Sequence, residues 1–586
     1  MQPNNPYKEY KMTASDKKID KRTIKTKRAI KTAFTSLITE KELDRITIKD
    51  VAEKAGITRK TFYYYYNGIW QVVEESENEL LAAVETSLED IPVTDLSDFA
   101  RRIFAKLGMS IDENSEFYYK LFRSCKNIEF FDKIADIYYD EQEKLFGKAV
   151  YFAGDPFHEG GQSEGIDVKA AAKKILQAMR RKTPEAIWII QGWQRNPMRD
   201  LLEGLEHGEA IILDLMACER PQWGGIKNSL FYKAEGHMHH DWIWCALPNF
   251  GGKTGLHGKM SSYASGVVFA KNHPLGKNLC GIGTAPEGIG TIPVVYDMVY
   301  DIAWREDSID IKDWVNQYTQ YRYGKADPNC NRAWEILSKT IYECHNEIGG
   351  PVESYICARP SDTIKHASSW GTAEIFYDPA EIVTAWECMY NVRHEFAQSE
   401  TYQYDLVDLT RQVLGDYAKY LHKQAVNAFY RNDLKGFQTY SSKFLALIRD
   451  EDKLLSTRKE FNVGTWINQA RNAACTPQEQ ERFVANAKRQ ITTWTNHDSK
   501  LHDYALKEWS GLMRDMYLPR WEAWVDYKLA LLRGETAQEP DYFQIEKNWV
   551  GSDTRYDSTS TGNAISAVEE IYKKYFIELQ QTYKNI

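Results

Sequence analysis

Five short apolar runs, separated by stretches with helical periodicity, constrain the fold of this chain more than any other feature. They span residues 150–153, 186–190, 210–215, 242–247 and 280–284. Apolar runs of this length, bounded by Gly or Pro, are typical of buried strands. Strands that alternate with helices predict a parallel sheet. Because a closed (β/α) barrel needs eight strands, we predict a partial barrel of about five strands.

Two of these runs end in a loop that carries a lone glutamate. Gly154-Asp155-Pro156 ends the first run and Glu159 follows it, whereas Glu287 stands between Pro286 and Gly288 after the last run. Active-site acids of barrel enzymes lie at the carboxyl ends of strands. Glycoside hydrolysis uses two carboxyl groups, one to protonate the departing oxygen and one to face the anomeric carbon. The pattern therefore suggests a glycosidase, although a solvated loop acid would look the same.

Five motifs then follow one another as in the α-N-acetylglucosaminidases, family 89 of the glycoside hydrolases. They are residues 151–161, 188–193, 242–252, 284–288 and 404–412. The resemblance covers the chain from about residue 130 to its C-terminus. It implies hydrolysis of terminal α-linked N-acetylglucosamine from glycans, with retention and without a cofactor. It makes Glu159 the general acid/base, protonated at the start of the reaction, and Glu287 the nucleophile, about 5–5.5 Å away.

The same resemblance implies a set of substrate-binding residues, on the partial barrel and further along the chain. They are His158, Trp193, Trp244, Asn249, Phe250, Trp494, Leu501 and Tyr504. Each aromatic residue of this set could equally be part of an ordinary packed core. The match at Leu501 leaves its position open, because the surrounding loop has one extra residue.

After about Trp304 the pattern becomes helical, with amphipathic runs over residues 406–430 and 484–494. This resembles the all-helical C-terminal domain of the family, which in relatives closes over the sugar. We therefore expect a catalytic region over 129–305 and a helical domain over 306–586. The family has further barrel strands ahead of the Glu159 strand, so the chain looks like a truncated enzyme whose activity we expect to be impaired.

One histidine-rich stretch allows a zinc interpretation. His237, His239, His240 and Asp241 stand close together, with Cys245 nearby, and such residues can chelate zinc. The resembling family uses no metal, and a polar insertion before a strand explains the stretch equally well. We therefore predict no metal site.

The N-terminal segment predicts three helices with a tight turn between the last two. Ile30, Ala33, Phe34, Leu37 and Ile38 form one apolar stripe. A second helix follows the N-cap residue Thr47, Gly56 ends it, and Thr58 caps a third helix over 59–66. Helix, Gly turn and short basic helix predict a helix-turn-helix, whose second helix enters the major groove. A plain three-helix core with a basic surface is the alternative.

Residues 52–63 also resemble the TetR family of transcriptional regulators. The resemblance implies DNA contacts by Thr58, Arg59, Lys60, Thr61 and Tyr63, with the cations on phosphates and the hydroxyls fixing register. We expect this truncated regulator to span 21–128, behind a basic disordered tail over 1–20. The larger helical domain that binds inducer and forms the dimer in this family is not apparent, so the sequence does not predict an oligomeric state.

Composition restricts where the chain acts and what it binds. The net charge of -9 argues against nucleic-acid binding by the whole molecule, although residues 1–30 carry nine Lys and Arg against three acids. The nine cysteines are scattered, which suits reduced thiols in a cytosol. No apolar signal segment or membrane-length run appears. We therefore expect a cytoplasmic protein with no membrane partner.

Three interpretations of the whole chain remain open. The first is an impaired exo-α-N-acetylglucosaminidase that carries a TetR-type DNA-binding segment. The second is a TetR-type regulator with a glycosidase-derived sugar-binding module, for which sugar should alter DNA affinity. The third is a joining of two unrelated genes, for which the two halves should share no interface.

Overall fold

The computed structural model describes residues 21–41, 43–89, 128–159, 161, 163–224, 233–346 and 349–584. The chain divides into two compact units. Met1–Phe152 and Ala170–Ile187 form the first, and Ala153–Lys169 and Trp188–Ile586 form the second. The predicted tail over 1–20, and residues 90–127 of the predicted regulator, lie outside the described residues. The predicted domain limits at 20, 128 and 305 stay predictions.

The first unit begins with four helices around one apolar core. These are α1 (Lys21–Glu40), α2 (Ile48–Lys54), α3 (Arg59–Tyr65) and α4 (Ile69–Glu89). The predicted stripe from Ile30 to Ile38 is buried in this core, together with Phe62 of α3. Thr47 and Asp50 form a capping box at the start of α2, and the Thr58 side chain caps α3. Gly56 makes the turn between them with a φ of 67°.

Two further helices belong wholly or largely to this unit. They are α7 (Ile128–Phe146), which contains the helix predicted from Phe130, and α8 (Val168–Lys182). The Arg181 guanidinium on α8 lies 2.9 Å from carboxylate oxygens of both Asp132 and Asp136 on α7. These ion pairs fix the two helices side by side.

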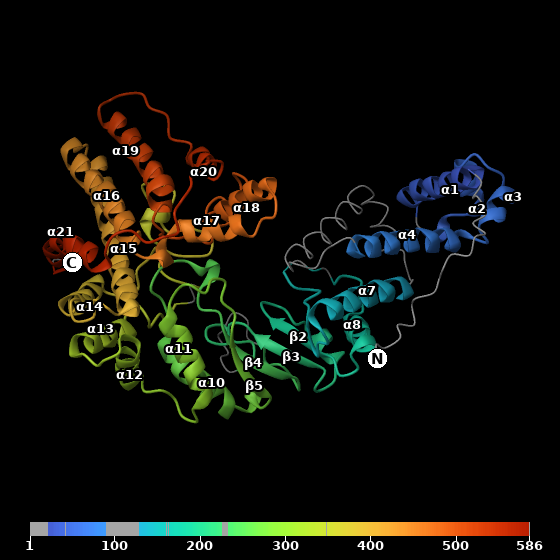
Figure 1. The fold of residues 1–586 in the computed structure, drawn as a ribbon, viewed down its shortest axis with the longest axis horizontal. Helices are drawn as coiled ribbons and strands as arrows, with labels where there is room; N and C mark the ends of the chain where they lie inside the picture. The colour runs from blue at the N-terminus through green and yellow to red at the C-terminus, as the bar shows by residue number, and fades with distance from the viewer. Residues whose placement is uncertain are drawn as a thin grey trace, which may run out of the picture. The chain divides into compact units, whose positions relative to one another are not determined.

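The five predicted strands form one sheet in chain order, β1-β2-β3-β4-β5. They are β1 (Tyr151–Ala153), β2 (Ile187–Gly192), β3 (Ala210–Asp214), β4 (Asp241–Ala246) and β5 (Leu279–Thr284). Neighbouring strands from β2 to β5 are parallel. The short helix α9 (Arg199–Glu203) lies between β2 and β3 in the sequence, and α10 (Met260–Asn272) and α11 (Pro293–Asp301) pack beside β5 (Figure 1). The partial parallel sheet of the prediction is confirmed, with β1 and β5 at its edges.

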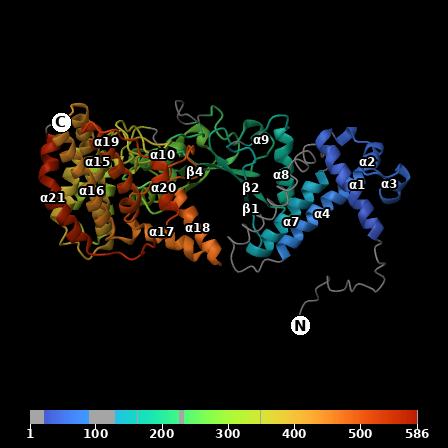
Figure 2. The ribbon, with the colours of Figure 1, turned by 90° about the horizontal axis from the view of Figure 1, so that it is seen from above.

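The rest of the second unit is helical, as predicted. It contains α12 (Ile311–Tyr323), α13 (Pro328–Lys339), α14 (Pro379–Asn391), α15 (Glu400–Tyr430), α16 (Leu434–Leu455), α17 (Val463–Asn472), α18 (Pro477–Gln490), α19 (Leu518–Leu532), α20 (Tyr542–Val550) and α21 (Ala564–Lys584). Helix α15 packs along α16 and α21, and α16 packs on α19 (Figure 2). Within the described residues, every helix is too short or too polar to cross a membrane.

One predicted helix has the wrong limits. The run over 484–494 was expected to be helical throughout, but α18 begins at Pro477 and ends at Gln490. Its start is fixed by Thr476, whose side chain accepts a hydrogen bond from the Glu479 backbone N–H, and by proline at the first helical position. It cannot continue to Trp494, because Trp494 has a φ of 60°, in the left-handed region.

Candidate active site

Glu159 lies in the loop after β1 and is held by an indole. Its side chain is exposed, and Trp193 Nε1 donates to Glu159 Oε1 over 2.7 Å. Trp193 follows β2, the neighbouring strand of β1. The two loops that follow these neighbouring strands bring two predicted site residues, 34 positions apart in the sequence, into direct contact.

Asp155, which is not among the predicted site residues, fixes the segment that carries Trp193. Asp155 Oδ1 accepts from the Gln191 backbone N–H at 2.8 Å and from Asn196 Nδ2 at 2.9 Å. Asn196 and Trp193 in turn exchange two backbone hydrogen bonds, of 2.8 and 3.0 Å. Burial raises the pKa of the Asp155 carboxyl, whereas these two donors lower it. Asp155 is thus a positioning residue for the indole that reaches Glu159.

Glu287 lies after β5 and accepts two hydrogen bonds on one oxygen. The Gly251 backbone N–H donates to Glu287 Oε2 at 2.7 Å, and the Tyr504 hydroxyl donates to the same atom at 2.6 Å. Oε1 takes part in neither bond, and the side chain is exposed. One oxygen is therefore fixed, and the other takes part in neither of these bonds.

Two glycines make the Gly251 contact sterically feasible. The loops after β4 and β5 cross where a Cβ on Gly252 would lie only 2.6 Å from the Gly288 Cα. A Cβ on Gly251 would lie 2.3 Å from the Tyr504 carbonyl oxygen. Both Gly251 and Gly252 have φ in the left-handed region, at 69° and 57°. Only residues without a side chain allow this backbone to reach Glu287.

The donors to the two glutamates pack on one apolar surface, which we call the apolar floor (Met216, Leu247 and Phe250). Trp193 and Tyr504 both pack against it, and the Trp193 and Phe250 rings meet edge to face at 5.7 Å. Burial and the hydrogen bond to Glu287 raise the pKa of Tyr504 well above its usual value, and the charge of Glu159 adds to this. The Tyr504 hydroxyl therefore interacts electrostatically with both carboxylates, and it remains a hydrogen-bond donor.

A buried lysine supports the Gly251 loop from within. Lys507 Nζ donates to the Gly251 carbonyl at 2.9 Å and to the Gly252 carbonyl as well. Burial, with the positive charge of Lys253 nearby, lowers the pKa of Lys507 to about 7. Lys253 itself forms a buried ion pair of 2.7 Å with Glu353. Neither lysine is among the site residues predicted from the sequence.

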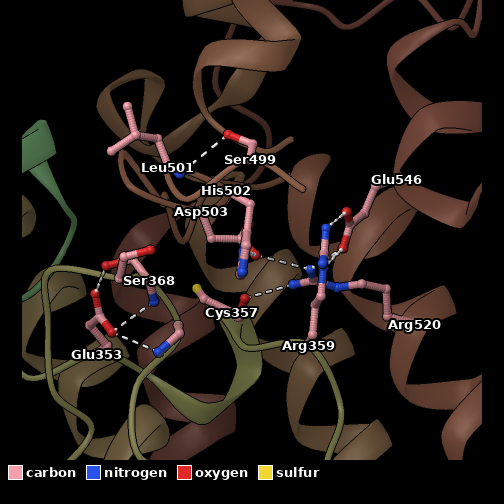
Figure 3. Close-up of polar contacts among 12 residues, drawn as sticks. Glu353, Cys357, Arg359, Ser368, Ser499, Leu501, His502, Asp503, Arg520 and Glu546 are labelled. Carbon is pink, nitrogen blue, oxygen red and sulfur yellow. Dashed lines mark hydrogen bonds and ion pairs between the residues drawn. The ribbon is translucent and has the colours of Figure 1, made fainter. Parts of the chain in front are cut away.

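The loop from Trp494 to Tyr504 brings the helical domain to the site. The Trp494 and Tyr504 rings meet edge to face at 5.7 Å. Asp503, next to Tyr504, is anchored by Arg520, whose guanidinium also binds Glu546 at 2.8 Å (Figure 3). Figure 3 shows the Leu501 side chain pointing away from both Arg520 and Glu353. Polar anchors below the loop thus set the position of Tyr504.

Three other predicted substrate residues lie in more enclosed places. Trp244 is fully buried, and a Cβ on Gly266 of α10 would lie 3.1 Å from its ring, so it packs between sheet and helix. Asn249 is buried, and its amide donates to the Lys253 carbonyl and to Thr291 Oγ1 within its own region. His158 is half-buried beside Asp155. The structure does not place Trp244 with the two glutamates.

The histidines of the zinc interpretation make contacts within the protein. His237 Nε2 lies 3.2 Å from Asp214 Oδ2, His239 Nε2 lies 3.3 Å from the Leu205 carbonyl, and His240 Nε2 lies 2.9 Å from the Leu202 carbonyl. In the part of the chain that the structure describes, no three His, Cys, Asp or Glu side chains are grouped to hold a metal ion.

Comparisons with known proteins identify the family of most of this chain. Residues 108–306 match the model of the α-N-acetylglucosaminidase TIM-barrel domain, and residues 314–574 match that of the C-terminal domain. These residues belong to the α-N-acetylglucosaminidase family. The chain is 29% identical over 468 residues to α-N-acetylglucosaminidase of Homo sapiens, which covers 76% of this chain and 60% of the human protein.

Solved structures of a family 89 glycoside hydrolase from Clostridium perfringens are also similar, at 33% identity and a TM-score of 0.71. The match covers 76% of this chain and 51% of the Clostridium chain. The present chain therefore spans about half the length of that enzyme. One of these structures contains 2-acetamido-1,2-dideoxynojirimycin. Another is a double glutamate-to-glutamine variant in complex with its substrate, GlcNAc-α-1,4-galactose.

A separate similarity concerns 22% of the chain. Over 134 residues the chain is 30% identical to the HTH-type dhaKLM operon transcriptional activator DhaS of Lactococcus lactis, of which the match covers 64%.

Proposed function

We propose that the second unit binds terminal α-linked N-acetylglucosamine and hydrolyses its glycosidic bond with retention of configuration. Glu159 is the general acid/base and Glu287 is the nucleophile. The observation that carries the proposal is that Trp193, the donor to Glu159, and Tyr504, a donor to Glu287, pack on the same apolar floor. A sugar on this floor would have a carboxyl group on each side.

The bonds at Glu287 suit a nucleophile. The Gly251 N–H and the Tyr504 hydroxyl hold Oε2, so Oε1 can attack the anomeric carbon while Glu159 gives its proton to the departing oxygen. Glu159 then takes a proton from water, and this water attacks the anomeric carbon and releases Glu287. The net reaction adds one water across the glycosidic bond, and no cofactor is required.

The names of the relatives support the substrate class, because they concern α-N-acetylglucosaminidase and a GlcNAc-α-1,4-galactose complex. We expect slow turnover, since β1 and β5 leave the described sheet with two open edges and a closed barrel would add further residues around the sugar. The open edges also favour self-association.

The test is hydrolysis of an aryl α-N-acetylglucosaminide. We expect slow turnover that Glu287→Gln abolishes, while Glu306→Gln, at an exposed position after α11, retains it. Turnover that survives Glu287→Gln would overturn the assignment. A wild-type protein that neither turns over the aryl glycoside nor binds N-acetylglucosamine would overturn the function.

A second function is favoured by the surface of α3. Thr58, Arg59, Lys60 and Tyr63 are exposed, Thr61 is partly exposed, and Phe62 between them is buried. We propose that this face binds DNA in the manner of TetR-type regulators, a proposal supported by the similarity to DhaS. This second proposal includes a cytoplasmic location. The eight cysteines in the described residues are unpaired thiols, which suits that compartment.

Fluorescence anisotropy with duplex DNA over a range of salt concentrations tests this second function. Arg59→Ala should weaken binding and reduce the salt slope by about one, whereas Lys133→Ala, on the exposed surface of α7, should leave both unchanged. Equal effects of the two substitutions would contradict a DNA-binding role for α3. Adding N-acetylglucosamine shows whether sugar and DNA binding are coupled, as the regulator interpretation requires.

A further inference from the structure

A groove of about 300 Å³ lies between α17 and α18 of the helical domain. The two helices pack side by side (Figures 1 and 2). The groove is lined by Trp466, Gln469, Ala470, Phe483, Asn486, Ala487 and Gln490. Its volume is at the lower end of the range for small-ligand pockets.

The lining consists of aromatic rings and amides. Trp466 and Phe483 supply flat apolar surface, and Gln469, Asn486 and Gln490 supply exposed amide groups. Each amide has two N–H donors and a carbonyl acceptor, which matches the mixed donor and acceptor character of sugar hydroxyls. Arg489 donates to Asn486 Oδ1 at 3.1 Å, so Asn486 offers its amide N–H groups to a ligand. None of the seven lining residues, all of them described, is Asp, Glu, Lys or Arg. The lining side chains themselves therefore suit a neutral ligand.

The groove is held in shape by its own side chains. Trp466 Nε1 donates to the Ala487 carbonyl at 2.9 Å, which ties α17 to α18. The Trp466 ring also lies 6.3 Å from the ring of Trp509. A wall that is already ordered costs little conformational entropy when a ligand binds.

The groove is connected to the candidate active site by a short run of contacts. The Trp494 backbone N–H donates at 2.8 Å to the carbonyl of Arg489, the neighbour of the lining residue Gln490. The Trp494 ring contacts Tyr504, and the Tyr504 hydroxyl contacts Glu287. One end of the groove thus lies beside the loop that lines the proposed sugar site.

We propose that this groove binds neutral sugar residues of a glycan whose terminal N-acetylglucosamine occupies the Glu159–Glu287 site. The inference rests on the proposed function and adds a preference for extended, uncharged glycans. The amides of Gln469 and Asn486 bind hydroxyl groups, and the Phe483 ring covers the apolar face of one sugar.

Isothermal titration calorimetry on the full chain carrying Glu287→Gln tests the inference, because substrate is then not consumed. The probes are N-acetylglucosamine and an oligosaccharide in which GlcNAc-α-1,4-galactose is extended by two neutral hexoses. We expect the oligosaccharide to bind at least tenfold more tightly than the monosaccharide. Adding Gln469→Ala and Asn486→Ala should remove this gain without changing the affinity for the monosaccharide.

A matched control separates the groove from the surface of α18 in general. Gln480→Ala, at an exposed position of α18 that does not line the groove, should keep the full gain. If the monosaccharide binds but extension gives no gain, or if the double variant keeps the gain, the groove inference is overturned and the proposed function stands. If neither ligand binds, the proposed function fails as well.

Discussion

Replacing Tyr504 by phenylalanine should impair catalysis strongly while leaving the fold intact. The substitution keeps the ring that packs on the apolar floor and against Trp494, but it removes the 2.6 Å hydrogen bond to Glu287. Hydrogen bonds to charged groups contribute about 1.5–3 kcal/mol. At about 1.4 kcal/mol for each factor of ten, kcat should fall about 10- to 150-fold. The bond both orients the nucleophile and stabilises the carboxylate when it leaves in the second step.

The assay is release of the aryl group from an aryl α-N-acetylglucosaminide, with thermal unfolding measured in parallel. The control is Tyr321→Phe, because Tyr321 on α12 is 90% exposed. Both variants should unfold near the wild-type temperature, and only Tyr504→Phe should lose activity. A kcat within twofold of wild type for Tyr504→Phe would refute the role assigned to this hydroxyl.

Three further predictions concern the residues that support the two glutamates. Gly252→Ala would place a Cβ 2.6 Å from the Gly288 Cα, so turnover should fall at least tenfold, and wild-type turnover would contradict the loop crossing. Asp155→Ala removes the acceptor of Asn196, and the loss of about 1–3 kcal/mol should lower kcat/KM by about 5- to 150-fold. An unchanged kcat/KM would show that Trp193 does not need this support. The pKa of Lys507 is lowered to about 7 in the folded chain. Between pH 7 and about 10.5 the unfolded chain therefore holds a proton on this lysine that the folded chain lacks. The free energy of unfolding, measured relative to Lys507→Met, should rise with pH by up to about 1.4 kcal/mol per unit. A stability difference that stays constant in denaturant titrations from pH 7 to 9 would contradict this.

The strand pattern made much of the fold predictable. The five apolar runs each became a strand within two residues of the predicted limits, because short buried strands bounded by Gly and Pro carry a strong local signal. The end of α18 was missed since it depends on the left-handed backbone of Trp494, which no periodicity reveals.

The two glutamates were selected from strand-end position and motif, but their supports were not. Asp155 acts through its hydrogen bond to Asn196, which lies 41 positions further along the chain. A contact over that separation is a tertiary feature. Lys507 contacts the Gly251 carbonyl across 256 positions of sequence. No local sequence pattern around either residue therefore predicts the contact. Burial of Trp244 on the α10 side of the sheet likewise depends on which face of β4 is covered.

The stereochemistry of azide rescue tests the two catalytic roles most directly. With a 2,4-dinitrophenyl α-N-acetylglucosaminide, whose departure needs little acid assistance, azide should restore turnover to both Glu159→Ala and Glu287→Ala. In Glu159→Ala, azide replaces water in the second displacement, so the product should be the α-glycosyl azide. In Glu287→Ala, azide replaces the nucleophile in a single displacement, so the product should be the β-glycosyl azide. The same anomer from both variants, or the reverse assignment, would contradict Glu159 as acid/base and Glu287 as nucleophile.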